Sequence, residues 1–309
     1  MLSIVGTMYC SALYLEDFVL RALAAAAGVS ADVEVVLVND GSPDDSLAVA
    51  KRLADHHPEV RVVDLSRNFG HHRAMMCALE HARGDHVFLI DVDLEEAPEL
   101  LPGFWERMHG QPGIDVVFGQ QRRRRGGWYS RVSGRLYYTL IRRLGDVPLT
   151  PNLVTVRLMT RRYVDALLQY REREMFMAGL WHDAGFRQVA VPIDKGDKGD
   201  TSYSLARKLS LVVNSVTAFS AKPLRMIFYT GVAISFAGSL FALYLAWRRL
   251  VHGIPVDGWT SVMVSIWFLG GLVILFLGII GIYLSKVFIE VKQRPYTTVR
   301  EIYRGGGDA

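Results

Sequence analysis

Four carboxylates stand close together in the segment VFLIDVDLEEAPE at residues 87–99: Asp91, Asp93, Glu95 and Glu96. Carboxylates at this spacing repel one another unless a cation lies among them. Hard oxygen ligands of this kind suit magnesium or manganese, usually shared with a phosphate-bearing substrate. A solvated acidic turn is the alternative, and spacing alone does not separate the two. The segment therefore indicates a candidate metal and phosphate site, and its surroundings must decide between the two interpretations.

The acidic segment comes at the end of a series of alternating elements. Strand-like apolar runs are expected at 3–8, 34–39, 60–65, 87–91 and 115–119, with helical patterns around 13–27, 45–56 and 71–82. This alternation predicts an α/β fold in which a parallel sheet is joined by crossover helices. Such sheets bind ligands at the carboxyl ends of their strands. The elements thus predict where a site would lie.

Polar motifs follow three of these strands at the predicted ligand edge. They are VNDGS at 38–42, SRNFG at 66–70 and the acidic segment. Each motif alone is compatible with ordinary turn chemistry, because Asn, Asp, Gly and Ser favour turns for local reasons. Three motifs at matching topological positions favour one shared site.

Two long runs without charged residues lie near the C-terminus, at 226–247 and 261–285. Each reaches the roughly 20 residues that cross a bilayer core, in a chain that is 50% hydrophobic. Two buried core helices are the alternative, but the flanking aromatic residues Trp247, Trp259 and Tyr283 favour spanning. The sequence therefore predicts a transmembrane hairpin.

The distribution of basic residues predicts the orientation of this hairpin. Its short connection carries Arg248 and Arg249, whereas more lysines and arginines flank its outer ends. The positive-inside rule then places both termini in the cytoplasm. The first 18 residues are expected to form a strand and not a signal peptide. Cys10 and Cys77 are too few for a disulfide framework, and both are expected to be reduced.

Two further segments have the pattern of basic amphipathic helices. An unbroken run of four arginines at 122–125 precedes the segment 128–144, where apolar residues alternate with arginines at helical spacing. The segment 203–222 is similar and leads into the first apolar run. Both patterns suit a membrane interface, although packing on the sheet with solvated arginines is the alternative for the first. The polar sequence DKGDKGD at 194–200 is expected to form a loop.

The chain is therefore expected to consist of four parts. They are a cytoplasmic α/β domain at 1–200, an interfacial juxtamembrane helix at 201–225, the transmembrane hairpin at 226–285, and a cytoplasmic C-terminal tail at 286–309.

With these motifs in order, the chain resembles glycosyltransferase family 2, and within it the polyprenyl-phosphate glycosyltransferases such as bactoprenol glucosyltransferases and dolichyl-phosphate mannose synthases. Besides the three strand-end motifs, the matching segments are RLM at 157–159, FMAGL at 176–180, GDTSYSLARKL at 199–209, KPLR at 222–225 and VKQRP at 291–295. The resemblance implies a Rossmann-like GT-A domain with a mostly parallel sheet that binds a nucleotide sugar, anchored by interfacial helices and a two-helix hairpin.

The implied activity is an inverting, metal-assisted transfer of a sugar from a nucleoside diphosphate, by family resemblance UDP, to a polyprenyl phosphate such as undecaprenyl phosphate. It would take place at the cytoplasmic face of a bacterial inner membrane, in the synthesis of cell-envelope polysaccharide. Membrane lipids and a second copy of the chain are the further partners expected, and no nucleic acid is expected.

The resemblance also assigns roles around the acidic segment, which corresponds to a DXD motif. Asp40 would contact the nucleotide base, Asp91 the ribose or the metal, and Asp93 the Mg²⁺ or Mn²⁺ that bridges the diphosphate. A divalent cation there would stabilise the charge on the leaving diphosphate. Glu96 stands where the family usually has Asp, which implies a supporting role on metal or sugar, whereas Glu95 is expected to be peripheral.

Further residues are implied to bind the two substrates. Donor contacts are expected from Thr7, Tyr9, Arg67, Asn68 and Gly70, whereas the neighbouring His71 and His72 are more typical of solvated histidines than of metal ligands. The acceptor phosphate is expected to be held by Arg124, Arg125 and Arg131. Guanidinium groups match phosphate geometry and stay charged, and without the resemblance the same arginines indicate a patch that attracts lipid.

The sequence departs from the family pattern at several positions. Thr155 stands where bactoprenol glucosyltransferases usually have the Asp that has been cast as the catalytic base, and Thr7, Cys10 and Ser11 replace Pro, Asn and Glu. A phosphate monoester has its second pKa near ~6, so the acceptor is mostly dianionic at neutral pH and needs little deprotonation. We therefore expect Thr155 to shape the sugar pocket or contact the acceptor. A catalytically impaired nucleotide-sugar-binding or scaffold protein, and transfer to a different lipid acceptor, are the alternatives.

Overall fold

The computed structural model describes residues 1–122, 152–173, 175–194, 220–252 and 258–305. The chain forms two units, each described here by itself. The first contains Met1–Tyr138, Leu149–Tyr203 and Gln293–Ala309, and the second contains Thr139–Pro148 and Ser204–Lys292. The first unit is therefore discontinuous in sequence. The predicted interfacial helix at 203–222 lies outside the described residues, apart from its last positions.

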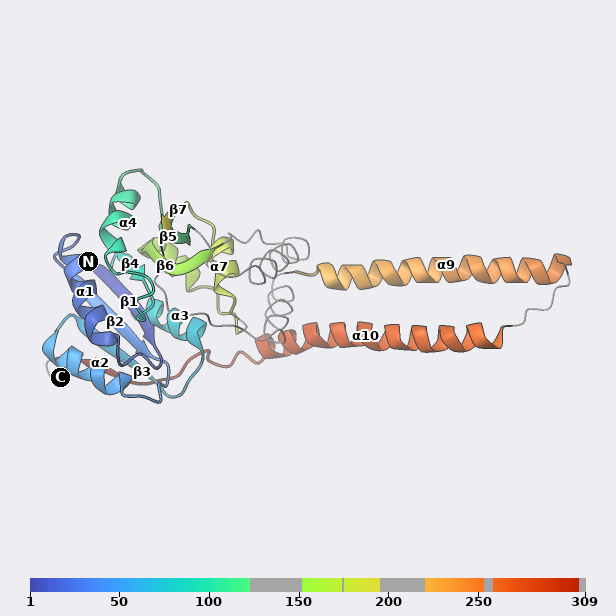
Figure 1. Cartoon of the computed structure of the whole chain (residues 1–309), viewed down its shortest axis with the longest axis horizontal. Helices are drawn as coiled ribbons and strands as arrows, with labels where there is room; N and C mark the ends of the chain where they lie inside the picture. Colours follow the sequence, from blue (N-terminus) through green and yellow to red (C-terminus); the bar gives the residue numbers. More distant parts are fainter. Residues whose placement is uncertain (123–151, 174, 195–219, 253–257, 306–309) are drawn as a thin grey trace. The chain divides into compact units, whose positions relative to one another are not determined.

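An eight-stranded sheet forms the centre of the described part of the first unit, in the order β7-β5-β6-β4-β1-β2-β3-β8 (Figure 1). The strands are β1 (Leu2–Met8), β2 (Val33–Asn39), β3 (Val60–Leu65), β4 (His86–Leu89), β5 (Val116–Gln121), β6 (Leu153–Thr160), β7 (Gln188–Ile193) and β8 (Val299–Arg304). Strands β4, β1, β2 and β3 are parallel, as are β5 and β7, whereas β6 and β8 run antiparallel to their neighbours. The predicted α/β fold is thus confirmed.

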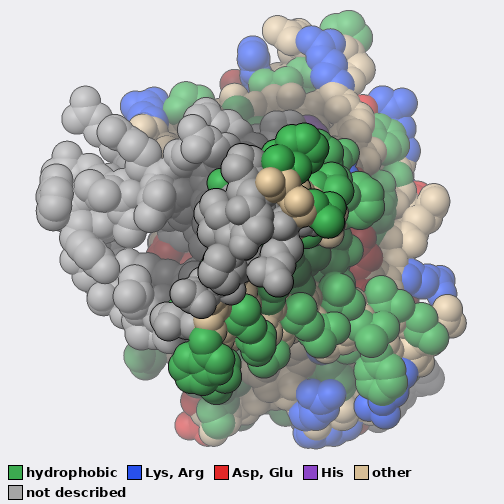
Figure 2. Space-filling view, turned by 90° about the vertical axis from the view of Figure 1, so that its right-hand side faces the viewer, with side chains coloured by type: hydrophobic (Ala, Val, Ile, Leu, Met, Phe, Trp, Pro, Cys, Tyr) green, Lys and Arg blue, Asp and Glu red, His purple; other side chains and the backbone are tan. Residues whose placement is uncertain are grey.

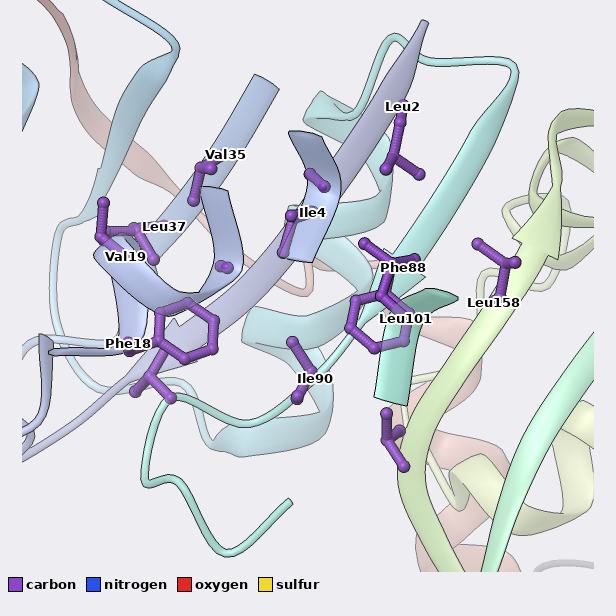
Figure 3. Packing of buried hydrophobic residues seen from close by; sticks show 14 of the residues in the cluster. Leu2, Ile4, Phe18, Val19, Val35, Leu37, Phe88, Ile90, Leu101 and Leu158 are labelled. Carbon is purple, nitrogen blue, oxygen red and sulfur yellow. The ribbon is translucent and has the colours of Figure 1, made fainter. Parts of the chain in front are cut away.

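Helices cover both faces of the central strands. They are α1 (Leu15–Ala27), α2 (Ser46–His56), α3 (His71–His81), α4 (Leu100–His109), α6 (Arg161–Leu167) and α7 (Met177–Asp183). One core cluster joins alternate residues of β1, β2 and β4, such as Ile4, Leu37 and Phe88, to residues of α1, α2 and α4, among them Phe18 and Leu101 (Figure 3). Burying each such side chain contributes about 1.5–3 kcal/mol. Strand residues of the opposite parity face the other side, where α3 contacts β1 and β2.

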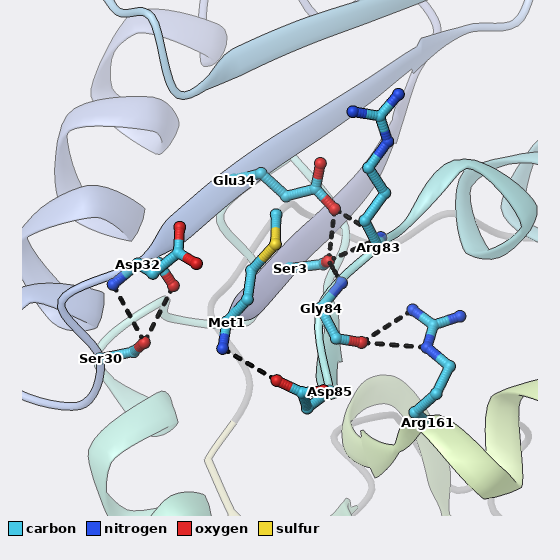
Figure 4. A network of polar contacts seen from close by, with 9 residues as sticks. All are labelled: Met1, Ser3, Ser30, Asp32, Glu34, Arg83, Gly84, Asp85 and Arg161. Carbon is cyan, nitrogen blue, oxygen red and sulfur yellow. Dashed lines mark hydrogen bonds and ion pairs between the residues drawn. The ribbon is translucent and has the colours of Figure 1, made fainter.

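A polar network closes the amino ends of β1, β2 and β4, at the opposite edge of the sheet from the three motifs (Figure 4). The Ser3 hydroxyl donates to the buried Glu34 carboxylate at 2.6 Å, and the Arg83 backbone N–H donates to the same carboxylate at 2.6 Å. The Gly84 N–H donates to Ser3 Oγ at 2.7 Å. These hydrogen bonds satisfy the buried polar groups at the amino ends of the strands, so the network has a structural role.

The strand β8 is a feature that the sequence analysis missed, since it assigned 286–309 to a tail. Residues 299–304 pair antiparallel with β3 at the edge of the sheet. The residues just before β8 also contact distant parts of the first unit, because the Tyr296 hydroxyl donates to Glu80 Oε2 at 2.6 Å and the Thr298 carbonyl accepts from the Ser66 N–H at 2.9 Å. The charged sequence VREIYR is typical of an exposed edge strand, which carries little hydrophobic signal.

The described part of the second unit consists of α9 (Lys222–His252) and α10 (Trp259–Val291). Within them, Lys222–Leu245 and Ser261–Val291 are long and apolar enough to cross a membrane, and neither is buried inside the protein. Hydrophobic side chains are prominent on the face shown in Figure 2. These segments overlap the expected spans at 226–247 and 261–285. Within this unit the Tyr283 hydroxyl donates to the Ser220 carbonyl at 2.6 Å.

Candidate active site

The three polar motifs meet at one edge of the sheet. Met8 at the end of β1 pairs with Asn39 at the end of β2, and Asn39 pairs with Asp64 near the end of β3. On the other side of β1, the Ile90 N–H donates to the Val5 carbonyl at 3.0 Å, so the acidic segment follows at the same edge. The parallel register therefore brings VNDGS, SRNFG and DVDLEE together, as ligand sites of such sheets require.

Asp40 joins the first two motifs. Its Oδ1 accepts a hydrogen bond from the Phe69 N–H at 2.7 Å, and its Oδ2 accepts one from the Gly70 N–H at 3.0 Å. Burial raises the pKa of the Asp40 carboxyl, and the two backbone donors oppose that rise without cancelling it. The structure thus shows Asp40 holding the SRNFG loop, and the contact with a nucleotide base stays a prediction.

Gly41 allows the two loops to touch. It adopts φ +62°, a left-handed conformation that glycine takes without steric cost. A Cβ atom at this position would lie 2.4 Å from the Asn68 nitrogen and 2.5 Å from the Arg67 carbonyl carbon. Since these neighbours are backbone atoms, they cannot move aside as a flexible side chain would. Glycine is therefore required both by the backbone angle and by the close approach of the second loop.

The loop after β1 is held by the segment that leads from β2 into α2. The Cys10 N–H donates to Ser42 Oγ at 2.7 Å, and the Ala12 N–H donates to Asp44 Oδ2 at 3.2 Å. Burial raises the pKa of Asp44, but hydrogen bonds from the hydroxyls of Ser42 and Ser46 and from backbone N–H groups outweigh it and lower the pKa to about 2. Asp44 is therefore ionised throughout the neutral range. Tyr9, in the same loop, is 50% exposed and available to a ligand.

Asp91 lies beside a histidine. His71, the first residue of α3, places its Nε2 3.5 Å from Asp91 Oδ1, and its Nδ1 is 3.0 Å from the Thr7 hydroxyl oxygen. Thr7, Asp91 and the start of α3 are thus linked at the strand ends. The sequence favoured a solvated His71, whereas the structure gives it these two partners. The apolar strand that ends at Asp91 predicted a carboxylate at this edge of the sheet. No local pattern in the sequence predicted that a histidine would lie beside it.

The acidic segment turns sharply after Asp91. Leu94 adopts φ +60°, and the Glu95 N–H donates to Asp93 Oδ1 at 3.1 Å. Glu96 is 1% exposed, whereas Asp91 and Asp93 are partly exposed. The turn thus directs the predicted supporting carboxylate inward and leaves the two predicted metal ligands accessible.

Asp91 and Asp93 fit a cation that is shared with a substrate. Among the described residues, no group of three or more His, Cys, Asp and Glu side chains is arranged to hold a metal by itself. Mg²⁺ typically binds through one or two carboxylates, with substrate phosphates and water completing its coordination. Two accessible carboxylates at the ligand edge of the sheet match that donor set. They are too few to form a closed structural metal site by themselves.

Thr155 lies in β6, the strand next to β4, which leads into the acidic segment. In the antiparallel ladder of β4 and β6, Leu89 pairs with Arg157, so the chain at Thr155 extends past the end of β4. The ladder with β5 pairs Phe118 with Arg157 and Gln120 with Leu153, which leaves an irregularity in β6 around Thr155. Such bulges redirect side chains near active sites. The position is therefore suited to line the site, and the role of Thr155 stays a prediction.

Arg157 is a buried cation whose importance the sequence analysis did not predict. Its guanidinium carbon lies 3.0 Å from the centre of the Trp181 ring, and its Nε donates to the Thr155 carbonyl at 3.1 Å. Burial lowers the pKa of Arg157 to about 9, and the charge of Glu96 acts against that fall. Arg157 therefore stays mostly cationic at neutral pH. An arginine within the apolar strand LVTVRLMT was the available signal.

The remaining predicted residues fall into two groups. Arg67 and Asn68 are exposed on the SRNFG loop, where the Arg67 side chain donates to the Asn68 carbonyl at 2.9 Å and lies over the Phe69 ring. Gly70 adopts φ +97° immediately before α3. The predicted acceptor residues Arg124, Arg125 and Arg131 lie outside the described residues.

The chain is similar to a known protein family and to solved structures. The model of Glycosyl transferase family 2 matches residues 3–168, which include the three motifs, Thr155 and Arg157. A mannosyltransferase from Pyrobaculum calidifontis, solved in complex with GDP-Man and Mn²⁺, superimposes with a TM-score of 0.48 at 17% identity, over 94% of this chain and 86% of that one.

Curated relatives cover nearly the whole chain. A Mycobacterium tuberculosis protein described as "Putative glycosyltransferases" is 52% identical over 302 residues, which are 98% of this chain and 88% of the relative. A prophage-derived bactoprenol glucosyl transferase of Shigella flexneri is 34% identical over 280 residues, 89% of each chain. On the family match and these relatives, the chain belongs to glycosyltransferase family 2 and is a glycosyltransferase.

Proposed function

We propose that the protein transfers a sugar from a nucleoside-diphosphate donor, with UDP as the expected nucleotide, to a polyprenyl phosphate at the cytoplasmic face of the membrane. The observation that carries the proposal is the convergence of VNDGS, SRNFG and DVDLEE at one sheet edge. The two apolar helices support a membrane-bound acceptor, and a relative over 89% of the chain is described as a bactoprenol glucosyl transferase.

The reaction forms one bond and breaks one. A phosphate oxygen of the acceptor attacks the anomeric carbon of the sugar, and the bond from that carbon to the diphosphate breaks, with its electron pair leaving on the nucleoside diphosphate. Attack from the face opposite the leaving group inverts the anomeric centre. Since the acceptor phosphate is mostly dianionic at neutral pH, its second pKa being near ~6, little proton removal is needed before attack.

The residues of the site divide the work between holding the donor and stabilising the leaving group. Asp91 and Asp93 would hold a divalent cation, Mg²⁺ or Mn²⁺, which when bound neutralises charge on the departing diphosphate. The buried Glu96 supports the turn that carries them. Asp40 fixes the loop from which Arg67 and Asn68 would contact the donor. Thr7, Tyr9 and Gly70 complete the donor side.

The acceptor phosphate is assigned to Arg124, Arg125 and Arg131, because three guanidinium groups can match its oxygens and remain charged. The basic residues on both outer flanks of the hairpin support the cytoplasmic orientation.

The proposal is tested by incubating the purified full-length protein with polyprenyl phosphate, Mg²⁺ or Mn²⁺, and a panel of UDP- and GDP-sugars. Mass spectrometry of the lipid product is expected to show a sugar joined through a phosphodiester. A simple glycoside on another lipid would instead show a different acceptor. Metal-dependent nucleotide binding without transfer from any donor would contradict the proposal and favour a binding or scaffold protein.

Restoring the family's aspartate tests whether a catalytic base is needed. Thr155→Asp is expected to change turnover by less than about fivefold, because a dianionic acceptor benefits more from positioning than from general-base help. Turnover is measured at saturating donor and acceptor across pH 6–9, with Thr155→Asn as a control of similar size that cannot act as a base. A gain of a hundredfold in Thr155→Asp alone would show that the missing base limits the reaction.

A further inference from the structure

The side chain of Arg300 in β8 contacts the donor side of the site. Its Nη1 lies 3.3 Å from Asp64 Oδ2, and its Nη2 donates to the Ser66 carbonyl at 2.7 Å. Ser66 is the first residue of the SRNFG motif. A single guanidinium group therefore contacts both the carboxylate near the end of β3 and the backbone from which the second donor loop begins.

The sheet is locally deformed at this position. Asp64 pairs with Glu301 and Leu65 pairs with Val299, so Arg300 is an extra residue on β8 that has no opposite partner in the ladder. Bulges of this kind turn a side chain away from the regular alternation and recur next to active sites. Here the bulge accompanies the contact of an otherwise exposed strand residue with a carboxylate that is 2% exposed.

The carboxylate of Asp64 continues the connection to the first donor loop. Its Oδ1 accepts a hydrogen bond from Asn39 Nδ2 at 2.7 Å, and Asn39 Oδ1 accepts one from the Ser42 N–H at 3.2 Å. Burying a carboxylate is costly unless it is hydrogen-bonded and paired with an opposite charge. Arg300 supplies a positive charge, and Asn39 passes the constraint to the VNDGS turn.

We propose that Arg300 is a positioning residue for the donor site: the strand that follows the apolar hairpin fixes VNDGS through Asp64 and Asn39, and fixes SRNFG through the Ser66 carbonyl. This inference rests on the proposed function, because the proposed function is what assigns these loops to the nucleotide sugar. It adds a residue more than 200 positions away from both motifs to the donor site. The C-terminal segment is then part of the catalytic unit in function as well as in structure.

The test compares two arginines of the same strand in the full-length protein. Arg300→Met removes the contacts with Asp64 and Ser66. Arg304→Met also removes an exposed positive charge from β8, but residue 304 lies opposite Arg61 in the ladder, away from both motifs. Amide hydrogen exchange is followed in peptides covering 38–42 and 66–70. Loss of this charge-assisted contact is expected to raise exchange there about tenfold in Arg300→Met, with little change in Arg304→Met.

A merely structural role is distinguished by two further readouts. Peptides covering β5 and β7 report global loosening, and they are expected to exchange at the wild-type rate in Arg300→Met. The Kd for UDP with Mn²⁺ is expected to rise about tenfold in Arg300→Met, to recover in part in Arg300→Lys, and to rise no further when Asp64→Asn is added to Arg300→Met. Unchanged exchange in the two motif peptides, or equal loosening throughout the sheet, would overturn the proposal. Failure of sugar transfer by the wild-type protein would instead reject the proposed function, while the exchange result would still decide the role of Arg300.

Discussion

Asp93→Asn is expected to lower the rate of sugar transfer by about a thousandfold, because a neutral amide binds a divalent cation far more weakly than a carboxylate does. Asp93 is partly exposed at the ligand edge of the sheet, next to the left-handed turn at Leu94. Fold and stability should be retained, since the hydrogen bond that Asp93 Oδ1 accepts from the Glu95 N–H can also be accepted by an amide oxygen. The rate is measured with donor, acceptor and Mn²⁺ titrated separately, so that a loss of metal affinity is separated from a loss of turnover.

Glu95→Gln is the matched control for this variant. It removes one negative charge from the same turn, and we expect it to reduce the rate by less than about fivefold, because the position is assigned no role on metal or sugar. Equal losses in Asp93→Asn and Glu95→Gln would mean that the turn acts only through its total charge. Undiminished transfer by Asp93→Asn would remove its assignment as a metal ligand.

Gly41→Ala is expected to cost about 3 kcal/mol of folding stability and to remove most donor binding. Roughly 1 kcal/mol comes from placing a side chain at φ +62°, and the rest comes from the contact of the new Cβ with the Asn68 nitrogen and the Arg67 carbonyl carbon. Because these are backbone atoms, the SRNFG loop must move away from VNDGS. Thermal unfolding and the Kd for UDP with Mn²⁺ measure the two effects.

Gly113→Ala separates backbone strain from the clash between loops. Gly113 also has a left-handed angle, φ +80°, but a Cβ there would meet nothing within 4 Å, and it lies between α4 and β5, apart from the three motifs. Its expected cost is about 1 kcal/mol with donor binding intact. If Gly41→Ala behaved like Gly113→Ala in both measurements, the close packing of the two loops would not matter for the site.

The sequence predicted the central sheet because local and topological signals agree there. Apolar runs such as SIVGTM and EVVLVN are buried strands with helical patterns between them, and their polar ends mark the ligand edge. Asp91, Asp93 and Asp40 could therefore be placed at this edge from their positions in the sequence alone. Parallel strands in register place the motifs that follow them at one edge, whatever the details of packing.

The features that the sequence analysis missed depend on contacts between distant residues. The strand VREIYR carries charges at its exposed positions, so its pairing with β3 has no hydrophobic signature. His71 acquires its neighbours Thr7 and Asp91 only when α3 packs against β1 and β2. In the sequence, Arg157 stood out only as part of a short motif. Its contact with Trp181 joins β6 to α7, and such a contact between distant residues leaves no local pattern. Asp40 shows a different limit, since the family resemblance implies a contact with the nucleotide base, whereas its two hydrogen bonds from loop amides appear only in the fold.

The late position of β8 in the chain also has a consequence for biosynthesis. Ser66 and Arg300 are separated by 234 residues, so a ribosome working at about 5–20 residues per second delivers Arg300 roughly 12–47 seconds after the loop that it contacts. For most of that interval the nascent chain holds all three motifs while the outer edge of β3 has no strand beside it, and unpaired edges are prone to wrong pairing. The apolar helices are translated in the same interval. The strand β8 thus completes the described sheet only after the two apolar helices have been made, which ties maturation of the donor site to their synthesis.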